Sequence, residues 1–471
     1  MAASSDSAGG RFQVPLPLFQ SKQILKSAEK RTTGPPMVTN RVDTEIIEQN
    51  VDAIPSNPSL ARAPTMSASA TVQFELISDP NSLDKYEDDW NRLEQQSPDS
   101  ACFDDYRQSI SDADSVRQMR LFVIKDAEQI IGFAPFLLFS GKKKYTLGER
   151  QLFGCRVQYL ALFGRDCVGS VPVQVAGNLL DAVLCHGGFT LLELRDIATD
   201  GALYQALTGS LQQKCVWRNR GRKTALHWLI ELPESMDKYL SSMKSKTRQT
   251  LKRKQRKFLE EQNGSVVCVS NAGQLRWFLD EGEKISRKTY QWSVGQRLQN
   301  DPVLFRSYKQ LADAGRLRCY MLMDNEKPCA FMRGFLVRDT YVYETPGFDP
   351  AYGHLSPGTV LMMHSIADLI ENTQCRIFDF GEGGDDVGYK SIFGNRSFPT
   401  VTLDVSGRSR FYPRILFSIQ DTLDILKNTG HWVLADARIK TTIRKWLRKG
   451  GAATKQETGG ITSPPQNDSP T

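Results

Sequence analysis

The sequence of 471 residues is poor in the features that mark metal-binding, secreted or membrane-spanning chains. It has only five histidines, none at metal-ligand spacing from another His or a Cys, so we expect no zinc site. Its nine cysteines are unpatterned and form no Cys-x-x-Cys pair, which favours reduced thiols in a cytoplasmic protein. No apolar run reaches the ~20 residues of a membrane span. The N-terminus lacks the basic and apolar regions of a signal peptide.

The overall composition, 40% hydrophobic and 24% charged residues, is ordinary for a soluble globular chain. The length is sufficient for two or more domains. The segments 1–70 and 450–471 are rich in small and polar residues, so we expect a disordered leader and a disordered tail. Between them, strand-like and helix-like patterns alternate in two similar series, which indicates a duplicated α/β unit. The domains that we predict are an N-terminal unit (71–233), a basic helical arm (234–264), a C-terminal unit (265–405) and a helical tail (406–449).

Hydrophobic periodicity also predicts individual elements of both units. In the first unit we expect one helix over 81–96, two separate strands over 151–153 and 157–163, and a last strand over 227–232. In the second unit we expect one helix carrying Leu275, Phe278 and Leu279 and another over 282–290. A strand over 399–405 is expected to close the second unit.

The most informative stretch runs from Arg318 to Gly394. Three strand-like runs, at 319–323, 329–337 and 340–345, precede a helix predicted over 357–372. Ser356 has a typical N-cap side chain, and Pro357 suits the first helical position, where a missing N–H costs nothing. A final strand over 376–380 leads into a glycine-rich segment. This order predicts an anion-binding helix N-terminus beside the strands, and we expect the chemistry there.

Three segments of this stretch resemble the CelD/BcsL-type acetyltransferases of the GNAT superfamily. They are Gly347-Phe348-Asp349-Pro350-Ala351-Tyr352, Leu355-Ser356-Pro357-Gly358 and Phe378-Asp379-Phe380-Gly381, with Tyr389-Lys390 downstream. The resemblance extends back to about residue 73 by order of elements, although the glutamine/arginine-rich pyrophosphate signature of most GNAT proteins is absent. It implies an α/β (α+β) chain with a tandem GNAT-like acyl-CoA N-acyltransferase fold, as two mixed sheets flanked by helices.

Acyl transfer from acetyl-CoA or another acyl-CoA needs a cradle for a pyrophosphate, and the start of the predicted helix suits that role. Ser356, Gly358 and Thr359 are the residues that we expect there, because amides at a helix N-terminus attract anions and glycine allows close approach. An ordinary capped helix is the alternative. By resemblance, two strands splay apart and pair with the pantetheine arm, and these would be 330–337 and 341–345.

Arg333 lies between Phe331 and Phe335 on an apolar strand face, so its guanidinium needs a partner. A two-residue hairpin turn at Arg338-Asp339 would place Glu344 opposite it, and a three-residue turn would place Thr345 there. The pair is either a structural ion pair or evidence that Glu344 is a general base, with Arg333 counted among the cofactor-binding residues.

Three further residues are candidates for the chemistry. Asp379, near the end of its strand between two phenylalanines, is a second candidate base, because ligands collect at strand ends in α/β sheets. By resemblance, Tyr389 would protonate the departing thiolate and Lys390 would bind an anionic group.

Two basic segments predict contacts with anions. Between Lys238 and Lys257 the arm carries nine Lys or Arg and no acidic residue, either as a solvated face or as a guide for polyanions. Nucleic acid ranks last among these polyanions, because no aromatic residues are interleaved for base stacking. The end of the tail places Ile439, Ile443 and Trp446 on one side among cations, either docked on its own domain or resting on an anionic membrane.

The leading interpretation is an acyltransferase that moves an acyl group from acyl-CoA to an amine or hydroxyl. The resemblance implies a small-molecule or glycan acceptor and a role in polysaccharide or cell-envelope biosynthesis. Two alternatives stay open: a FemAB-like transferase that uses aminoacyl-tRNA, which the basic arm would suit, and a non-catalytic GNAT-fold module in polysaccharide export.

Overall fold

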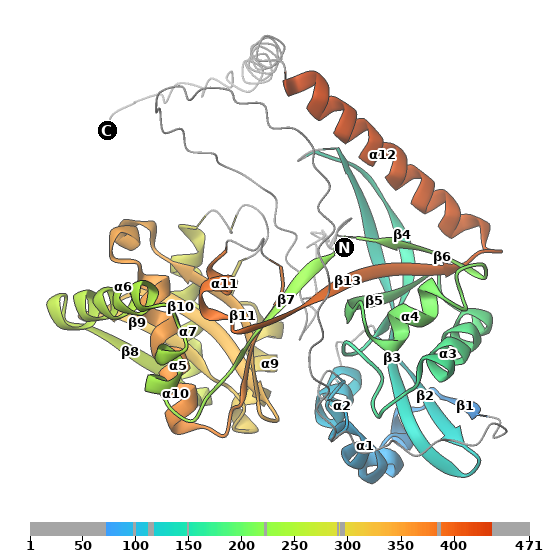
Figure 1. The fold of residues 1–471 in the computed structure, drawn as a ribbon, viewed down its shortest axis with the longest axis horizontal. Coiled ribbons are helices and arrows are strands. Elements are labelled where there is room, and N and C mark those ends of the chain that lie inside the picture. The colour runs from blue at the N-terminus through green and yellow to red at the C-terminus, as the bar shows by residue number, and fades with distance from the viewer. Residues whose placement is uncertain are drawn as a thin grey trace, which may run out of the picture.

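The computed structural model describes residues 72–435, apart from 98–99, 112–116, 148–149, 221–223, 290–291, 293–296 and 384–387. Within these residues, thirteen strands form one continuous mixed sheet with helices on both faces (Figure 1). The α/β class is confirmed, but the expectation of two sheets was wrong. The sheet is continuous because each half receives a strand from the other.

The described part of the N-terminal unit (residues 72–231) contributes seven strands to the sheet and has helices on both faces of it. Its strands are β1 (Val72–Ile77), β2 (Gln118–Asp126), β3 (Gln129–Leu147), β4 (Arg150–Leu162), β5 (Leu191–Ala198), β6 (Cys215–Asn219) and β7 (Ala225–Glu231). Its helices are η1 (Pro80–Ser82), η2 (Asp84–Tyr86), α1 (Glu87–Glu94), α2 (Phe103–Ser111), α3 (Val173–His186) and α4 (Ala202–Thr208).

Three predictions for this unit need correction. The helix expected over 81–96 begins as two 3₁₀ turns, η1 and η2, and becomes α-helical only at Glu87. The two short strands expected after residue 150 are one strand, β4, because all of it pairs with the long strand β3 in an antiparallel hairpin. The strand β6 was not predicted.

The C-terminal unit (residues 264–407) follows the basic arm, which consists of α5 (Met236–Ser241), α6 (Ser245–Arg256) and the π-helix η3 (Lys257–Glu261). Its strands are β8 (Gly264–Val269), β9 (Cys319–Asp324), β10 (Lys327–Val337), β11 (Thr340–Phe348), β12 (Ile377–Glu382) and β13 (Arg396–Gly407). Its helices are α7 (Ala272–Arg287), α9 (Pro302–Asp313), η4 (Pro350–Leu355), α10 (Pro357–Asn372) and α11 (Tyr389–Phe393). The two helices expected between 275 and 290 are one helix, α7.

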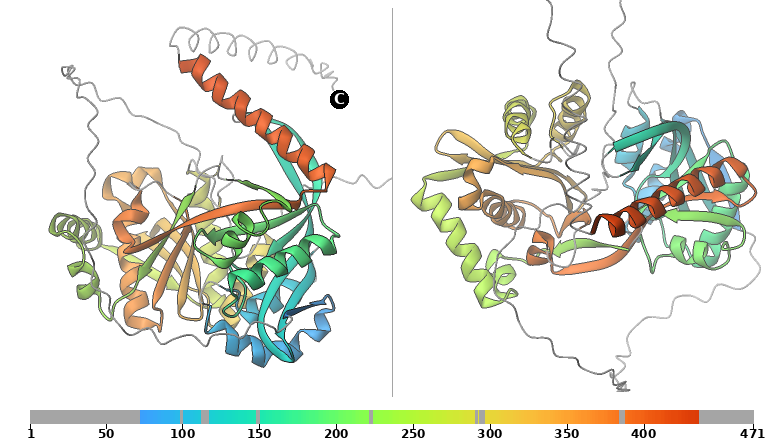
Figure 2. Two further views of the ribbon diagram at one scale, coloured as in Figure 1. Left: turned by 45° about the vertical axis from the view of Figure 1, so that its right-hand side comes forward. Right: turned by 90° about the horizontal axis from the view of Figure 1, so that it is seen from above.

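The strand order shows the duplication. Strands β1 to β5 and strands β8 to β12 each lie in chain order, and each series ends in a parallel pair, β4 with β5 and β11 with β12. In each unit a helix, α3 or α10, connects the parallel strands. Two units with the same topology therefore stand side by side in one sheet (Figure 2).

The two units exchange their last strands. β7, which ends the N-terminal unit in sequence, pairs with β12 of the C-terminal unit. β13, expected to close the C-terminal unit, pairs instead with β5 and β6 of the N-terminal unit, and the two exchanged strands also pair with each other. Figure 1 shows β7 and β13 running between the two halves.

Alternating side chains bury both faces of the sheet. In β9, Tyr320 and Leu322 pack with α10, whereas Cys319, Met321 and Met323 pack with α7 and α9. In β2, Phe122 and Ile124 pack with α3, whereas Leu121 and Val123 pack with α1 and α2. Such strands are continuous apolar runs because helices cover them on both sides.

The chain ends in α12 (Phe411–Ala435), which packs over the β3–β4 hairpin through Leu416, Phe417 and Leu423 (Figure 1). None of the helices in the described ranges is long and apolar enough to cross a membrane. The expected leader, the basic amphipathic turns around Ile439 and Trp446, and the expected tail lie outside the described residues.

Candidate functional site

The central feature of the C-terminal unit is the divergence of two parallel strands. β11 and β12 pair over only three positions, the last of them Val342 with Asp379. Beyond this point β11 stays paired to β10 as far as Phe348, whereas β12 continues along β7. The strands that separate are therefore β11 and β12. The pair expected to splay, 330–337 and 341–345, instead forms an antiparallel hairpin that is closed from Ala330 to Val337.

A kink in β12 produces the divergence. Between Asp379 and Gly381 the register with β7 shifts by a β-bulge, and Gly381 has a φ of +68°, a conformation that favours glycine. The Asp379 carboxylate accepts a hydrogen bond from the Gly381 N–H at 2.6 Å. On its other side the kink is held by Lys390, whose Nζ donates to the carbonyls of Phe380, Gly381 and Glu382 at 2.8–3.0 Å. Lys390 was predicted to bind an anionic group, but in the structure it holds the backbone of the kink.

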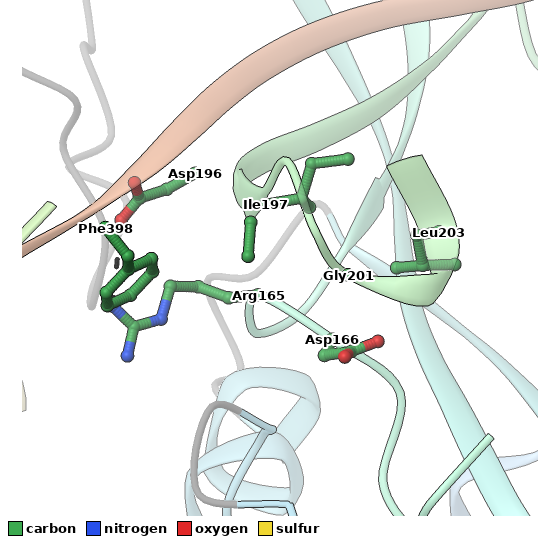
Figure 3. Close-up of a pocket in the computed structure, with 8 residues that line it drawn as sticks. Arg165, Asp166, Asp196, Ile197, Gly201, Leu203 and Phe398 are labelled. Carbon is green, nitrogen blue, oxygen red and sulfur yellow. Dashed lines mark ion pairs between the residues drawn. The ribbon is translucent and has the colours of Figure 1, made fainter. Parts of the chain in front are cut away.

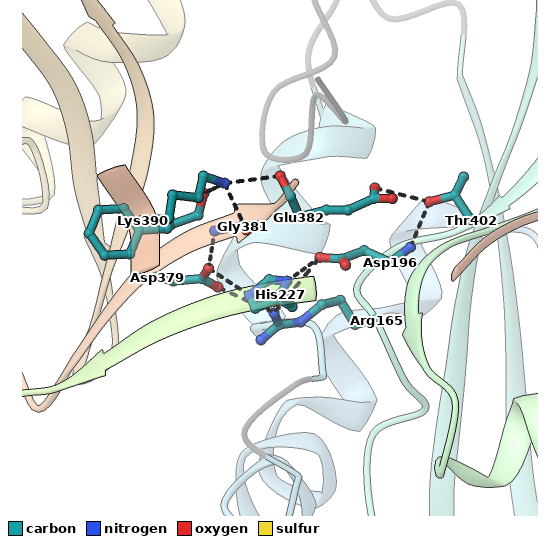
Figure 4. A network of polar contacts seen from close by, with 9 residues as sticks. Arg165, Asp196, His227, Asp379, Gly381, Glu382, Lys390 and Thr402 are labelled. Carbon is teal, nitrogen blue, oxygen red and sulfur yellow. Dashed lines mark hydrogen bonds and ion pairs between the residues drawn. The ribbon is translucent and has the colours of Figure 1, made fainter. Parts of the chain in front are cut away.

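The N-terminal unit supplies the charges that face Asp379 (Figure 4). His227 Nε2 lies 2.7 Å from the Asp379 carboxylate, and His227 Nδ1 lies 2.5 Å from Asp196. Arg165, from the loop after β4, lies 3.4 Å from Asp379. His227 is fully buried, so this cluster is a buried ion network that joins both units.

The network perturbs the protonation of its members. Burial disfavours the imidazolium, but Asp379 and Asp196 outweigh burial and the Arg165 cation and raise the pKa of His227. Burial acts to raise the pKa of Asp379, yet His227 and Arg165 hold it well below its usual range. Burial lowers the pKa of Lys390 to about 8 and raises that of Glu382. An ion-paired carboxylate with a depressed pKa is a weak base, so Asp379 does not suit the role of general base.

The α10 N-terminus stands at the end of β11. Ser356 has a left-handed backbone (φ +56°), and its side chain makes no capping bond, so the predicted Ser356 N-cap interaction was wrong. The Thr359 N–H is bonded to the Ser356 carbonyl at 2.9 Å. The Val360 N–H donates to the same carbonyl at 3.3 Å, and Pro357 has no N–H, so the Gly358 amide is the group of this turn that remains for an anion. A Cβ added at Gly358 would meet nothing closer than the Phe348 ring at 3.9 Å.

Arg333 and Glu344 lie together on the face that α7 and α9 cover. The predicted two-residue turn is confirmed by the pairing of Val337 with Thr340, and a bulge at Arg333 shifts the register further along. Arg333 lies 3.7 Å from the Glu344 carboxylate and donates to the Thr345 hydroxyl at 3.0 Å, so both predicted neighbours contact it. The Tyr308 hydroxyl donates to Glu344. Arg333 is 9% exposed, and its Nε has no partner among the described residues.

Tyr389 begins α11, next to the kink. Its hydroxyl lies 3.2 Å from that of Tyr343 in β11, and its ring packs against Phe380 in β12. Tyr389 therefore bridges the two diverging strands, and 42% of its side chain is exposed. Burial raises the pKa of Tyr343 well above its ordinary value, so Tyr343 is a neutral hydrogen-bonding partner for Tyr389.

Two hollows lie among the described residues, one of them beside the Arg165–Asp196 side of the buried network. One of about 20 Å³ is lined by Arg165, Asp196, Ile197, Leu203 and Phe398 in the N-terminal unit, at the place that corresponds to the β11–β12 divergence (Figure 3). It has room for about one water molecule. Another, of about 430 Å³, is an open groove beside the start of α9, lined by residues that include Arg276, Phe305 and Lys309.

The structure thus brings Asp379, Tyr389 and Lys390 together at the kink, while Gly358 lies at the end of β11 and Arg333 with Glu344 lies on the α7–α9 face. Sequence reasoning missed Arg165, Asp196 and His227. A signal existed for His227, because it stands between Leu226 and Trp228 in a strand of mostly apolar residues, the same signal that singled out Arg333. No group of His, Cys, Asp and Glu in the described ranges is arranged to hold a metal ion.

Comparison with known proteins agrees with this topology. Residues 245–391 match the family model of the acetyltransferase (GNAT) domain, so this part of the chain carries a GNAT acyltransferase fold. No curated protein matches the chain.

Several solved structures resemble the chain at low identity. FemX has a TM-score of 0.43 at 10% identity, over 61% of this chain and 88% of FemX. A tandem GNAT protein from the clavulanic acid biosynthesis pathway has a TM-score of 0.44 at 9% identity, over 72% of this chain and 100% of that protein. The C-terminal domain of a putative lysylphosphatidylglycerol synthetase from Agrobacterium fabrum has a TM-score of 0.43 at 12% identity, over 73% of this chain and 97% of that domain.

Proposed function

We propose that the C-terminal unit transfers an acetyl or other acyl group from acyl-CoA to an amine or hydroxyl. The observation that carries this proposal is the divergence of β11 and β12 beyond Val342 and Asp379. Strand edges that separate leave backbone N–H and C=O groups for an extended ligand, and the amide-containing pantetheine arm suits such edges. The pyrophosphate is assigned to the first turn of α10, where Gly358 leaves space and the positive end of the helix dipole attracts anions.

Two side chains are assigned to the protons of the reaction. Glu344 accepts the proton of the acceptor as its nitrogen or oxygen attacks the thioester carbonyl, with Tyr308 and Arg333 holding the carboxylate in place. The C–S bond then breaks, and Tyr389 donates its proton to the departing thiolate. The exposed position of Tyr389 beside the kink and its contact with Tyr343 support this assignment.

The acceptor class rests on the resemblance to CelD/BcsL-type acetyltransferases. Under this proposal the acceptor is a small molecule or a glycan, in polysaccharide or cell-envelope biosynthesis, and the enzyme acts in the cytoplasm. The domain limits at 233/234 and 264/265 belong to the same proposal.

The test is a calorimetric titration of the full chain with acetyl-CoA, using two matched glycine variants. Gly358→Val places a branched side chain over the proposed pyrophosphate position, whereas Gly353→Val adds the same side chain in η4, where a Cβ meets nothing within 4 Å. We expect Gly358→Val to weaken binding at least tenfold, and Gly353→Val to leave it unchanged. Both should melt within about 3 °C of the wild type, because neither Cβ clashes with the protein. Equal affinity in all three proteins would refute the site.

The basic arm favours a second candidate, a transferase that takes its acyl group from aminoacyl-tRNA. α6 carries six cations and no acidic residue, and among its side chains only Leu251 is buried. Binding of tRNA in place of acetyl-CoA, lost as the salt concentration rises, would support this candidate.

A further inference from the structure

We propose that Arg165 and His227, which belong to the N-terminal unit in sequence, are positioning residues for the acyl-CoA site of the C-terminal unit. They hold the Asp379 carboxylate, and this carboxylate holds the kink that separates β12 from β11. The inference rests on the proposed function and adds to it a role for the N-terminal unit, which otherwise has none in the reaction.

The first step is the link from Asp379 to the kink. One oxygen of this carboxylate lies 2.7 Å from His227 Nε2 and accepts the Gly381 N–H at 2.6 Å. Gly381 is the residue whose left-handed backbone turns β12 away from its register with β7. The carboxylate therefore joins the imidazole and the kinked backbone through a single atom. Displacing the carboxylate removes the hydrogen bond that fixes Gly381.

The second step is the dependence of Asp379 on the N-terminal unit. Among the described residues it forms ion pairs with His227 in β7 and Arg165 after β4, and the carboxylate is 6% exposed. Removing a partner leaves a buried charge poorly compensated, so the carboxylate must move or take up a proton. A second connection runs parallel to the first, because the Thr402 hydroxyl in β13 donates to Glu382 at 3.3 Å and accepts the Asp196 N–H at 3.0 Å.

The third step concerns the corresponding place in the N-terminal unit. There β4 and β5 diverge after Ala161 and Glu193, as β11 and β12 do. That position holds the 20 Å³ hollow lined by Arg165, Asp196 and Phe398, too small for a pantetheine arm. Arg165 and Asp196 turn instead to Asp379 and His227 (Figure 4). We therefore expect each chain to bind one acyl-CoA.

The test compares two cluster variants with a control from a second cluster of buried carboxylates. His227→Gln and Arg165→Met each remove a partner of Asp379. Arg220→Met is the control, because Arg220 pairs with two buried carboxylates, Glu193 in β5 and Asp404 in β13, elsewhere in the sheet. We expect His227→Gln and Arg165→Met to raise the acetyl-CoA Kd and KM at least tenfold. Arg220→Met should lower the melting temperature by a similar amount and leave Kd and KM unchanged.

The pH dependence of acetyl-CoA affinity is a second measurement, and a loss of stability alone would not shift it. His227 faces Asp196, Asp379, Arg165 and Glu382. Its raised pKa means that the imidazolium is favoured in the folded protein, so acetyl-CoA affinity should fall as the pH rises through that pKa. Asp196→Asn keeps the side-chain shape and tolerates the left-handed backbone of this position (φ +52°). It removes one of the two anions, Asp379 and Asp196, that raise the pKa of His227, so the fall should move to lower pH.

The outcomes separate this inference from the proposed function. A wild-type chain that does not bind acetyl-CoA refutes the proposed function. A wild-type chain that binds one equivalent, with His227→Gln folded and binding equally well at every pH, refutes the inference alone. If His227→Gln does not fold, the Asp196→Asn variant tests the inference instead. The same pH dependence of acetyl-CoA affinity in Asp196→Asn as in the wild type would then refute the positioning role.

Discussion

At the scale of single residues, the chain concentrates its buried charge in small groups that span two or more elements. Arg333 is such a case, with Glu344 at 3.7 Å, the Thr345 hydroxyl at 3.0 Å and the Tyr308 ring 5.6 Å from the guanidinium carbon. We predict that Arg333→Met alone destabilises the fold by about 3 kcal/mol, because it strands the Glu344 carboxylate. The double variant Arg333→Met, Glu344→Gln should recover a large part of this loss, as measured by urea unfolding.

The same variants separate structure from catalysis at Glu344. If Glu344 is the general base, Glu344→Gln lowers kcat by at least about a hundredfold and changes the acetyl-CoA Kd little. Absence of coupling in the double-mutant cycle would refute the ion pair. Full turnover in Glu344→Gln would refute the base assignment while leaving the acyl-CoA site intact.

At the scale of elements, the basic arm and the kinked strand use charge in opposite ways. In β12 the Asp379 carboxylate is paired with His227 and Arg165, whereas the cations of α6 lie largely in solvent beside α10. We predict that replacing Lys252, Arg253, Lys254, Arg256 and Lys257 with Gln leaves the unfolding free energy unchanged or slightly higher. Mutual repulsion is relieved, and solvent-exposed pairs contribute little.

The functional prediction for the arm is a change in salt dependence. The Gln variant should bind an anionic partner more weakly at low salt, with a flatter dependence on ionic strength. Exchanging the same residues between Lys and Arg keeps the charge and is the matched control. Identical binding of the Gln variant and the wild type at low salt would show that the arm is a solvated surface without a role in anion binding.

At the scale of the whole molecule, the exchange of β7 and β13 makes the two units mutually dependent. Further contacts join them, because Arg316 pairs with Asp105 at 2.6 Å and Arg338 donates to the carbonyls of Glu94 and Ser100. We predict one cooperative calorimetric transition for the full chain. Leu194 lies in the core of the N-terminal unit. Leu194→Ala should remove about 2–5 kcal/mol of stability and so lower the temperature of this single transition. Two transitions, of which Leu194→Ala moves only one, would contradict this dependence.

The sequence by itself determined the local features of this protein. The bounds of α10 and the need of Arg333 for a polar partner both follow from residues close together in the chain, whereas the length of the turn between β10 and β11 was left open between two and three residues. Their physical causes are short-range, namely side-chain periodicity, turn geometry and the cost of burying a charge.

Only the tertiary structure decided which strands are neighbours and which charges meet. β7 and β13 are strand-like in sequence, but alternation shows that a strand is buried without showing which strands flank it. The exchange places His227 beside Asp379, 152 positions along the chain. It also leaves Lys390 facing three carbonyls at a kink that no local pattern marks. The candidate site depends on such pairings between distant segments, and a single sequence encodes them only through the complete packing of the sheet.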